Sequence, residues 1–232
     1  MSVTTKWIDI ESGDGTFGAY LAIPHTGKGP GIVLLQEIFG VNEHIRSVAE
    51  QYAADGYMVL VPDLFWRVGK HIELAYDDAG WKRAVELMNA TDVAKALADI
   101  ALTVAALKTQ PGLEGKMAVI GYCFGGMLAY NTAANGLVDA AIAYYGGGIQ
   151  NQLQRADEIT VPLLMHFGAA DKHIALDAVQ SIAERFEDND DVEVHVYPGA
   201  EHGFNCSHRS SYNQRAAAEA HGNSLTFLSD HL

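Results

Sequence analysis

Short apolar stretches recur along the chain, and between them lie segments in which apolar residues return every three or four positions. The short stretches have the length of buried strands, and the others have the period of a helix that packs on one face. The expected strands cover residues 3–10, 17–23, 31–35, 57–61, 117–121, 140–145, 161–167 and 192–197. This alternation predicts an α/β fold with a mostly parallel sheet and helices on both faces.

Turn and capping residues refine this pattern. Gly13-Asp14-Gly15 separates the first two strands and predicts an antiparallel hairpin. One helix is expected to end at Gly56, and its buried face would consist of Ile45, Val48, Ala49, Tyr52 and Ala53. A second helix is expected to be capped by Asp92, with the apolar stripe Val93, Leu97, Ile100, Val104 and Leu107. The alanine-rich stretch from about residue 211 to 228 predicts a third helix.

The polar stretch 65–90 has no readable period, and we interpret it as an excursion over the functional site. No internal repeat, low-complexity tract or Pro/Gly/Ser-rich linker divides the chain. We therefore expect one domain over residues 1–232, which is long enough to bury a substantial core.

The strand at 117–121 runs into Gly121-Tyr122-Cys123-Phe124-Gly125-Gly126, and a helical pattern follows. Such a sharp strand-to-helix turn needs glycines beside the tip, and it holds the tip residue exposed in strained backbone. The new helix directs its first N–H groups and its dipole at the tip, which favours a thiolate or an oxyanion. We interpret Cys123 as a nucleophile. The alternative is a buried small apolar residue in a glycine-rich turn.

A carboxylate and an imidazole follow the ends of two later strands. Asp171 comes after the strand at 161–167, and His202 comes after the strand at 192–197. This is the chain order of nucleophile, acid and histidine in α/β-hydrolases. His202 would take the thiol proton and later protonate the leaving oxygen, while Asp171 would fix the histidine tautomer. Alone, each residue has an ordinary interpretation as a turn or loop residue, but together they predict a catalytic triad.

The composition of the chain limits its expected partners and cellular location. The chain has 15 basic and 29 acidic side chains, a formal charge of −14, which argues against a nucleic-acid partner. No apolar run reaches the roughly 18–20 residues of a membrane span, and the first residues lack the pattern of a secretory signal. Two cysteines, Cys123 and Cys206, are too few for a disulfide framework. We expect a cytoplasmic protein, a monomer or small homo-oligomer, with a small-molecule substrate and no membrane partner.

The sequence resembles the dienelactone hydrolase family over nearly its whole length. The resemblance rests on residues 34–40, Leu-Leu-Gln-Glu-Ile-Phe-Gly, on the turn around Cys123, and on His202-Gly203-Phe204. It implies an α/β-hydrolase fold and hydrolysis of the enol-lactones formed when aromatic compounds are broken down, without metal or organic cofactor. It also implies that Glu37 interacts with the Cys123 thiol and rearranges on substrate binding, and that the backbone N–H groups of Ile38 and Phe124 form an oxyanion hole.

The chain departs from this family where the substrate carboxylate is bound. Well-known dienelactone hydrolases hold that carboxylate with two arginines. This chain has Cys206 at one of these positions, and Trp81 aligns with the other. With Phe39, these two residues are the expected lining of the substrate pocket. A cysteine or an indole does not replace a guanidinium, so we expect weaker use of carboxylated lactones. Possible substitutes nearby in the sequence are Lys82, Arg83 and Arg209.

Three alternatives remain open at this level. His202, Cys206 and His208 offer zinc-ligand atoms, although their spacing matches no established metal motif. A relative that only binds a ligand, or that senses oxidants through Cys123 or Cys206, would not need all three triad residues. The third alternative is a hydrolase of another small acyl substrate, such as a neutral lactone, an ester or a thioester.

Overall fold

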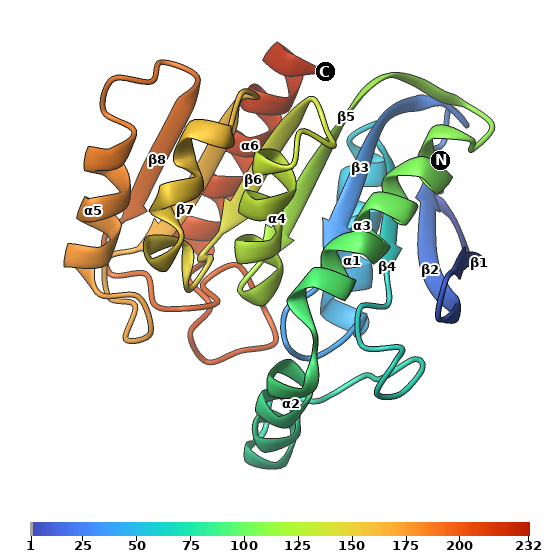
Figure 1. Ribbon diagram of the computed structural model, residues 1–232, viewed down its shortest axis with the longest axis horizontal. Coiled ribbons are helices and arrows are strands. Elements are labelled where there is room, and N and C mark those ends of the chain that lie inside the picture. Colours follow the sequence, from blue (N-terminus) through green and yellow to red (C-terminus); the bar gives the residue numbers. More distant parts are fainter. Residues whose placement is uncertain (1) are drawn as a thin grey trace. The chain divides into compact units, whose positions relative to one another are not determined.

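A computed structural model describes residues 2–232 of the chain (Figure 1). The described residues form two compact units, one up to Ala118 and one from Val119 to Leu232. Each unit combines strands with helices, and the expectation of one domain over the whole chain stays a prediction. No helix within residues 2–232 has both the length and the apolar character needed to cross a membrane.

The first unit contains a partly antiparallel group of strands in the order β1-β2-β4-β3. These strands are β1 (Thr4–Ser12), β2 (Gly15–Ile23), β3 (Gly29–Leu35) and β4 (Met58–Pro62). Strands β1 and β2 form the predicted hairpin, with Ser12 opposite Gly15. Strand β2 pairs antiparallel with β4, and β4 pairs parallel with β3. All of β4 and most of β3 are buried, as their uninterrupted apolar runs predict.

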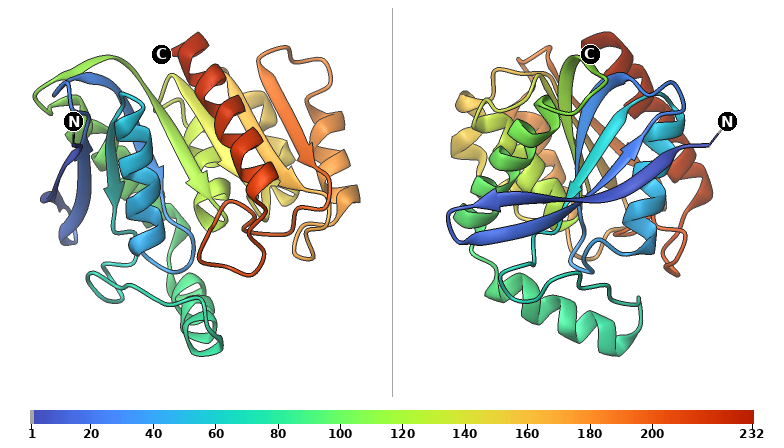
Figure 2. Two further views of the ribbon diagram at one scale, coloured as in Figure 1. Left: turned by 180° about the vertical axis from the view of Figure 1, so that it is seen from behind. Right: turned by 90° about the vertical axis from the view of Figure 1, so that its right-hand side faces the viewer.

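The helices of the first unit are α1 (Glu43–Ala54), α2 (Asp78–Ala90) and α3 (Val93–Lys108). Helices α1 and α3 lie on opposite faces of the strands (Figure 2, right). The predicted buried face of α1 is confirmed, and Gly56 follows the helix with a φ of +108°. Asp92 caps α3 as predicted, accepting hydrogen bonds from the N–H groups of Ala94 and Lys95. Helix α2 lies within the stretch 65–90 that showed no readable period.

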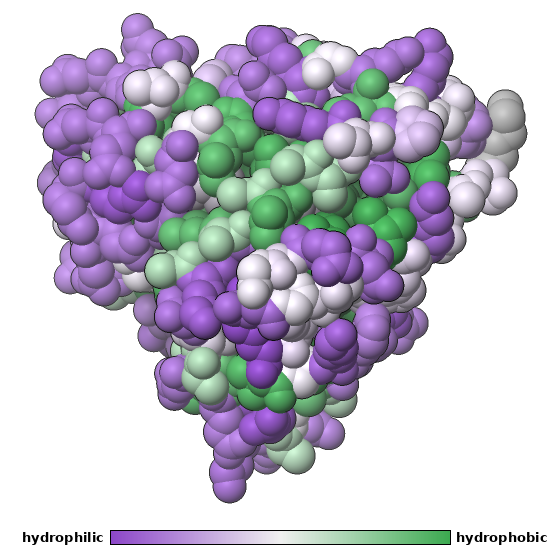
Figure 3. Space-filling model, turned by 45° about the vertical axis from the view of Figure 1, so that its right-hand side comes forward, coloured by the Kyte–Doolittle hydropathy of each residue, from purple (hydrophilic) through white to green (hydrophobic). Residues whose placement is uncertain are grey.

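The predicted apolar stripe of α3 is only partly correct. Ile100, Val104 and Leu107 are buried, but Val93 is 38% exposed. The reason is that α3 carries small and apolar residues nearly all round, so the sequence period does not single out one face. Leu102 is also exposed. Figure 3 shows that hydrophobic residues reach the surface among polar ones.

Strand β5 (Leu113–Tyr122) begins in the first unit and ends in the second. The second unit continues with the parallel strands β6 (Ala140–Tyr144), β7 (Leu163–Gly168) and β8 (Val192–Tyr197). Helices α4 (Phe124–Ala134) and α5 (Leu176–Arg185) lie on one face of these strands, and α6 (Gln214–His231) lies on the other (Figures 1 and 2). Two short 3-10 helices, η1 (Ile149–Asn151) and η2 (Leu153–Glu158), precede β7. The terminal helix is confirmed, whereas α5 had no prediction.

A buried polar network ties α6 to the strands of the second unit. The ring nitrogens of His166 lie 2.9 Å from Oη of Tyr197 and 3.0 Å from Oγ of Ser224. Ser224 also shares a 2.8 Å hydrogen bond with Tyr144, so β6, β7, β8 and α6 are joined. Burial holds the pKa of His166 well below its ordinary value, so the ring is neutral. The network fixes the strands whose carboxyl ends carry Asp171 and His202.

Candidate active site

Cys123 stands at a tight turn between β5 and α4, with a φ of +57°. Its N–H donates to the carbonyl oxygen of Tyr144 at 3.0 Å, and its own carbonyl accepts from the N–H of Gly126 at 2.9 Å. A Cβ added at Gly121 would lie 1.9 Å from the carbonyl oxygen of Gly125. At Gly126, it would lie 2.6 Å from that of Tyr144. The turn therefore requires glycine at both positions and holds the cysteine in strained backbone with its side chain partly exposed.

The structure brings the three predicted triad residues into one hydrogen-bonded chain. Nε2 of His202 lies 3.1 Å from Sγ of Cys123, and Nδ1 lies 2.8 Å from Oδ2 of Asp171. Asp171 follows β7 and His202 follows β8, so parallel neighbours deliver both residues to the same strand end. Both side chains are buried. The arrangement can transfer a proton between the thiol and the imidazole while the carboxylate orients the ring.

The second carboxylate oxygen of Asp171 is also engaged. It accepts hydrogen bonds from the backbone N–H groups of His173 at 2.7 Å and Ile174 at 3.1 Å. Burial on its own would raise the pKa of Asp171, but the hydrogen bond and charge of His202, with these two N–H groups, hold it below its ordinary value. The carboxylate therefore stays charged and fixed in orientation.

The electrostatics of His202 favour its protonated form. Burial acts to lower the pKa of His202, but the charge of a Cys123 thiolate and the hydrogen bonds to Asp171 and Cys123 raise it to about 10. An imidazolium held between a carboxylate and a sulfur stabilises a thiolate at that sulfur. These contacts are those that a cysteine nucleophile needs, and the nucleophilic role of Cys123 stays a prediction.

A turn after His202 places a cation beside it. The N–H of Cys206 donates to the carbonyl of Gly203, and the N–H of Arg209 donates to the carbonyl of Cys206. A Cβ added at Gly203 would lie 2.3 Å from an Nη of Arg209, so the guanidinium packs directly against this glycine. Cys206 itself is fully buried. In the second unit, Arg209 rather than the residue at 206 therefore supplies the positive charge next to His202.

The structure argues against a zinc site formed by His202, Cys206 and His208. Both ring nitrogens of His202 face the triad partners Cys123 and Asp171. His208 is exposed on the loop and Cys206 is buried. The histidine therefore serves the proton-transfer chain rather than a cluster with these two residues.

Glu37 follows β3 in the first unit and is fully buried. This burial excludes the ordinary role of a glutamate in a turn, which is to face solvent. Its Oε2 accepts a 2.8 Å hydrogen bond from the hydroxyl of Tyr76, a residue that the sequence did not single out. Ile38 is buried beside it, and Phe124 is the first residue of α4. The action of Glu37 on the thiol and the oxyanion hole of Ile38 and Phe124 stay predictions.

Three aromatic side chains of the first unit form a cluster around Phe39. The ring of Phe39 lies 4.4 Å from that of Tyr76 and 6.1 Å from that of Trp81, between centroids. Phe39 is buried, and Trp81, on α2, is 39% exposed. Lys82 and Arg83 are exposed. This cluster gives the predicted pocket residues Phe39 and Trp81 a shared apolar setting.

Sequence reasoning also missed two residues close to His202. The ring of Tyr145 lies 5.0 Å from that of His202, and the ring of His173 lies 5.1 Å away. Tyr145 carries a φ of +37°, which is rare outside glycine, but backbone strain at a tyrosine leaves no mark in the sequence. His173 stands two residues after Asp171, and this proximity was the one signal available.

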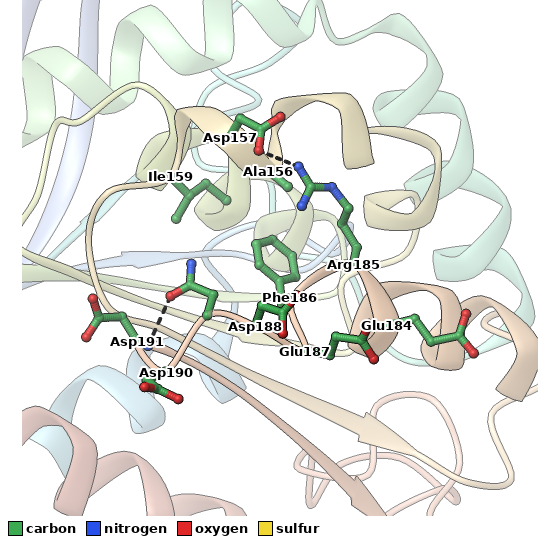
Figure 4. A pocket seen from close by; sticks show the side chains of 11 residues that line it. Ala156, Asp157, Ile159, Glu184, Arg185, Phe186, Glu187, Asp188, Asp190 and Asp191 are labelled. Atoms are coloured by element: carbon green, nitrogen blue, oxygen red, sulfur yellow. Dashed lines mark hydrogen bonds and ion pairs between the residues drawn. The ribbon is translucent and has the colours of Figure 1, made fainter.

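A separate hollow in the second unit is lined by residues of η2, α5 and the turn after α5. Figure 4 shows Arg185 pairing there with Asp157, at a distance of 2.6 Å, among further carboxylates. None of the triad residues lines it. A crowd of carboxylates offers no nucleophile with an oriented base, so chemistry rather than the size of a hollow locates the active site.

A cysteine at a strand-to-helix turn, followed along the chain by a carboxylate and a histidine after later strands, is the arrangement of α/β-hydrolases. The sequence pattern of the dienelactone hydrolase family matches residues 17–232. Carboxymethylenebutenolidase of Pseudomonas putida is 37% identical over 97% of this chain and 96% of its own length. The carboxymethylenebutenolidase of Pseudomonas sp. strain P51 is 36% identical over 97% and 94%.

A solved structure agrees with these relatives. The crystal structure of a candidate dienelactone hydrolase from Klebsiella pneumoniae matches all of both chains with a TM-score of 0.88 and 28% identity. The predicted α/β-hydrolase fold is confirmed. The chain belongs to the dienelactone hydrolase family and is a hydrolase that acts on lactones or esters.

Proposed function

We propose that this enzyme hydrolyses dienelactone-type substrates through a covalent acyl-enzyme at Cys123. The observation that carries the proposal is the chain of hydrogen bonds from Sγ of Cys123 through His202 to Asp171, built on a turn that only glycines permit. The proposal is further supported by the family and by the relatives named carboxymethylenebutenolidase.

The reaction begins when Sγ of Cys123 attacks the carbonyl carbon of the substrate. The carbonyl π electrons move onto oxygen, and the N–H groups of Phe124 and Ile38 stabilise this oxyanion. When the oxyanion collapses, the C–O bond to the leaving oxygen breaks, and His202 donates its Nε2 proton to that oxygen. In a lactone, the leaving group stays attached to the acyl chain, now a thioester on Cys123.

Hydrolysis of the thioester follows the same route in reverse. His202 takes a proton from water, the hydroxide oxygen attacks the thioester carbon, and the C–S bond breaks to release the acid and the thiolate. Asp171 holds Nδ1 of His202 throughout, which keeps Nε2 directed at the sulfur. In this scheme Glu37 modulates the thiol: two negative groups disfavour each other at short range, so the carboxylate must be neutralised or moved when the thiolate forms.

The substrate class is the finer part of the proposal. Arg209 beside Gly203 offers a cation for a carboxylated lactone, although Cys206 and Trp81 stand where related enzymes carry arginines. These two residues favour the second candidate, a hydrolase of neutral lactones, esters or thioesters. We keep the prediction of weaker use of carboxylated dienelactone, with a raised KM.

A substrate panel tests this choice. It compares cis- and trans-dienelactone with neutral lactones and p-nitrophenyl esters, on the wild type and on Arg209→Ala, Lys82→Ala, Arg83→Ala and Cys206→Arg. Weak use of carboxylated substrates that Cys206→Arg improves selectively would support the prediction. Efficient use that Arg209→Ala alone abolishes would contradict it and assign carboxylate binding to Arg209.

The catalytic role of Cys123 is tested by Cys123→Ala, which should reduce turnover by roughly four orders of magnitude or more, as loss of a triad nucleophile does. Iodoacetamide should inactivate the wild type by labelling Cys123, because Cys206 is buried, and a product analogue should slow the labelling. Retention of a tenth of wild-type turnover by Cys123→Ala would overturn the proposal.

We also propose a cytoplasmic setting, because the mechanism needs the thiol of Cys123 to stay reduced.

A further inference from the structure

We infer that Tyr76 is a positioning residue for Glu37, and that Asn42 directs the Tyr76 hydroxyl so that it holds the Glu37 carboxylate in one orientation. The inference rests on the proposed function, in which Glu37 acts on the Cys123 thiol. It adds a polar chain of three side chains, Asn42 to Tyr76 to Glu37, to the machinery of that reaction.

The backbone around Tyr76 is anchored rather than loose. Gly40 forms a β-bridge with Glu73, and the N–H of Leu74 donates to the carbonyl of Phe39 at 3.0 Å. The two segments touch so closely that a Cβ added at Gly40 would lie 1.9 Å from the carbonyl oxygen of Ile72. The segment that leads to Tyr76 is therefore fixed on the segment that follows Glu37.

An ion pair and a ring contact strengthen this anchor. Arg46 of α1 lies 2.7 Å from a carboxylate oxygen of Glu73. The ring of Tyr76 packs on the buried ring of Phe39, two residues after Glu37. The tyrosine is thus held from both its backbone and its ring, which leaves its hydroxyl little freedom of position.

The orientation of the Asn42 amide is fixed by two backbone groups. Its Oδ1 accepts from the N–H of Ile45 at 3.2 Å, as the N-cap of α1. Its Nδ2 lies 3.4 Å from the carbonyl oxygen of Leu74. If the amide were flipped, Oδ1 would face the carbonyl oxygen of Leu74 and Nδ2 would face the N–H of Ile45, and both contacts would be unfavourable. The amide nitrogen Nδ2 is therefore the atom that faces Tyr76.

This orientation decides where the Tyr76 proton points. Nδ2 of Asn42 donates to Oη of Tyr76 at 3.1 Å, so the hydroxyl acts as an acceptor on that side. Its single proton is then donated to Oε2 of Glu37 at 2.8 Å. Each member donates to the next, and the chain ends on a carboxylate that is fully buried. A buried carboxylate depends strongly on such donors for a defined position.

For the reaction, the contact matters because it sets the position of the Glu37 carboxylate. A carboxylate that modulates a thiol must occupy one position at rest and be able to leave it when the substrate binds. The hydrogen bond from the Tyr76 hydroxyl helps to define the resting position of the carboxylate. In this scheme Tyr76 acts on the reaction through Glu37.

The test combines Tyr76→Phe with Glu37→Gln, singly and together. The readouts are the rate of iodoacetamide alkylation of Cys123 in the resting enzyme, and kcat and KM for p-nitrophenyl acetate. Tyr76→Phe should change the alkylation rate and kcat by about tenfold, the effect of one hydrogen bond to a charged group, with KM nearly unchanged. In the Glu37→Gln background, the same substitution should add less than about twofold. The glutamine amide can still accept from Tyr76, but the charged carboxylate that acts on the thiol is gone.

The chain provides a matched control. Tyr20 of β2 also donates its hydroxyl to a glutamate of the same unit, Glu50, at 2.6 Å. Tyr20→Phe should leave alkylation and kcat within about twofold of the wild type, since this pair has no part in the site. Asn42→Ser is the second variant: it keeps a cap for α1 but loses Nδ2, and it should shift both readouts in the same direction as Tyr76→Phe by a smaller factor.

The outcomes separate the inference from the proposed function. If Glu37→Gln alters alkylation and kcat while Tyr76→Phe and Asn42→Ser behave like Tyr20→Phe, the positioning role is wrong and the function of Glu37 stands. An undiminished effect of Tyr76→Phe in the Glu37→Gln background would also overturn it, because Tyr76 would then act by another route. If Glu37→Gln itself changes neither readout, the role of Glu37 in the proposed function fails, and the inference fails with it.

Discussion

The turn around Cys123 and the segment that carries Tyr76 are built by different kinds of constraint. At the turn, positions near in sequence limit one another, and an added Cβ at Gly121 would strike the carbonyl four residues later. Tyr76 is placed by hydrogen bonds to Asn42 and Glu37, which lie 34 and 39 positions away. Local backbone demands restrict residue types and leave a pattern in the sequence, whereas a distant polar contact can be met by a single residue in an otherwise featureless stretch.

The largest expected effect concerns the triad. His202→Ala should cost nearly as much activity as loss of Cys123, and Asp171→Asn should reduce kcat by roughly 10⁴-fold by releasing the wrong histidine tautomer. Steady-state kinetics on p-nitrophenyl acetate would measure both. A Cys123→Ala/His202→Ala double variant should be little worse than either single variant, because the residues act as a unit. Additive losses would show that the two residues do not share a step.

The next prediction tests whether the turn truly depends on glycine. Gly121→Ala should destabilise the protein by about 3 kcal/mol, because the new Cβ meets backbone rather than a movable side chain. The control is Gly222→Ala in the middle of α6, where nothing lies within 4 Å of the added Cβ. That variant should gain up to about 1 kcal/mol from helix propensity. Equal stability of the two variants in urea unfolding would refute the steric account.

This contrast explains how far the sequence alone could go. It predicted the hairpin, the strands, the caps at Gly56 and Asp92, and the three residues that meet at the turn, because each follows from local pattern or strand order. It did not predict α2, whose stretch was interpreted as having no readable period, or α5. The sequence also did not predict the roles of Tyr76 and His173, or the packing of the Arg209 guanidinium against Gly203. These three depend on side chains that meet through the fold, which no period or motif encodes.

A titration of His202 tests how strongly the Cys123 thiolate and Asp171 stabilise the imidazolium. The pKa of His202, raised to about 10, implies an imidazolium that persists far above the ordinary 6.5. The sign follows from the raised value: protonation of His202 stabilises the fold fully below about pH 6.5, and this contribution is lost as the pH rises through about 10. In Cys123→Ala the thiolate charge is absent while burial still acts to lower the pKa, so the midpoint should fall. NMR of carbon-labelled histidine measures it, and an unchanged midpoint would contradict the coupling.

The smallest effect is expected in the aromatic cluster of the first unit. Trp81→Ala should change stability by only about 1 kcal/mol, since the indole is 39% exposed, but it should raise KM several-fold for aromatic esters. The matched control is Trp7→Ala, because Trp7 is 38% exposed on β1 of the same unit. If both variants leave KM unchanged across the ester panel, Trp81 does not line the substrate pocket.

The central claim is that Cys123 carries the acyl group during turnover. The most direct measurement is mass spectrometry of enzyme mixed with p-nitrophenyl acetate and quenched in acid within the first turnover, followed by peptide mapping. We predict one added acetyl group, located on the peptide that contains Cys123. This acetyl-enzyme should accumulate when deacylation is slower than acylation. An acetyl group on any other residue, or a burst of p-nitrophenol of unchanged size in Cys123→Ala, would contradict the account.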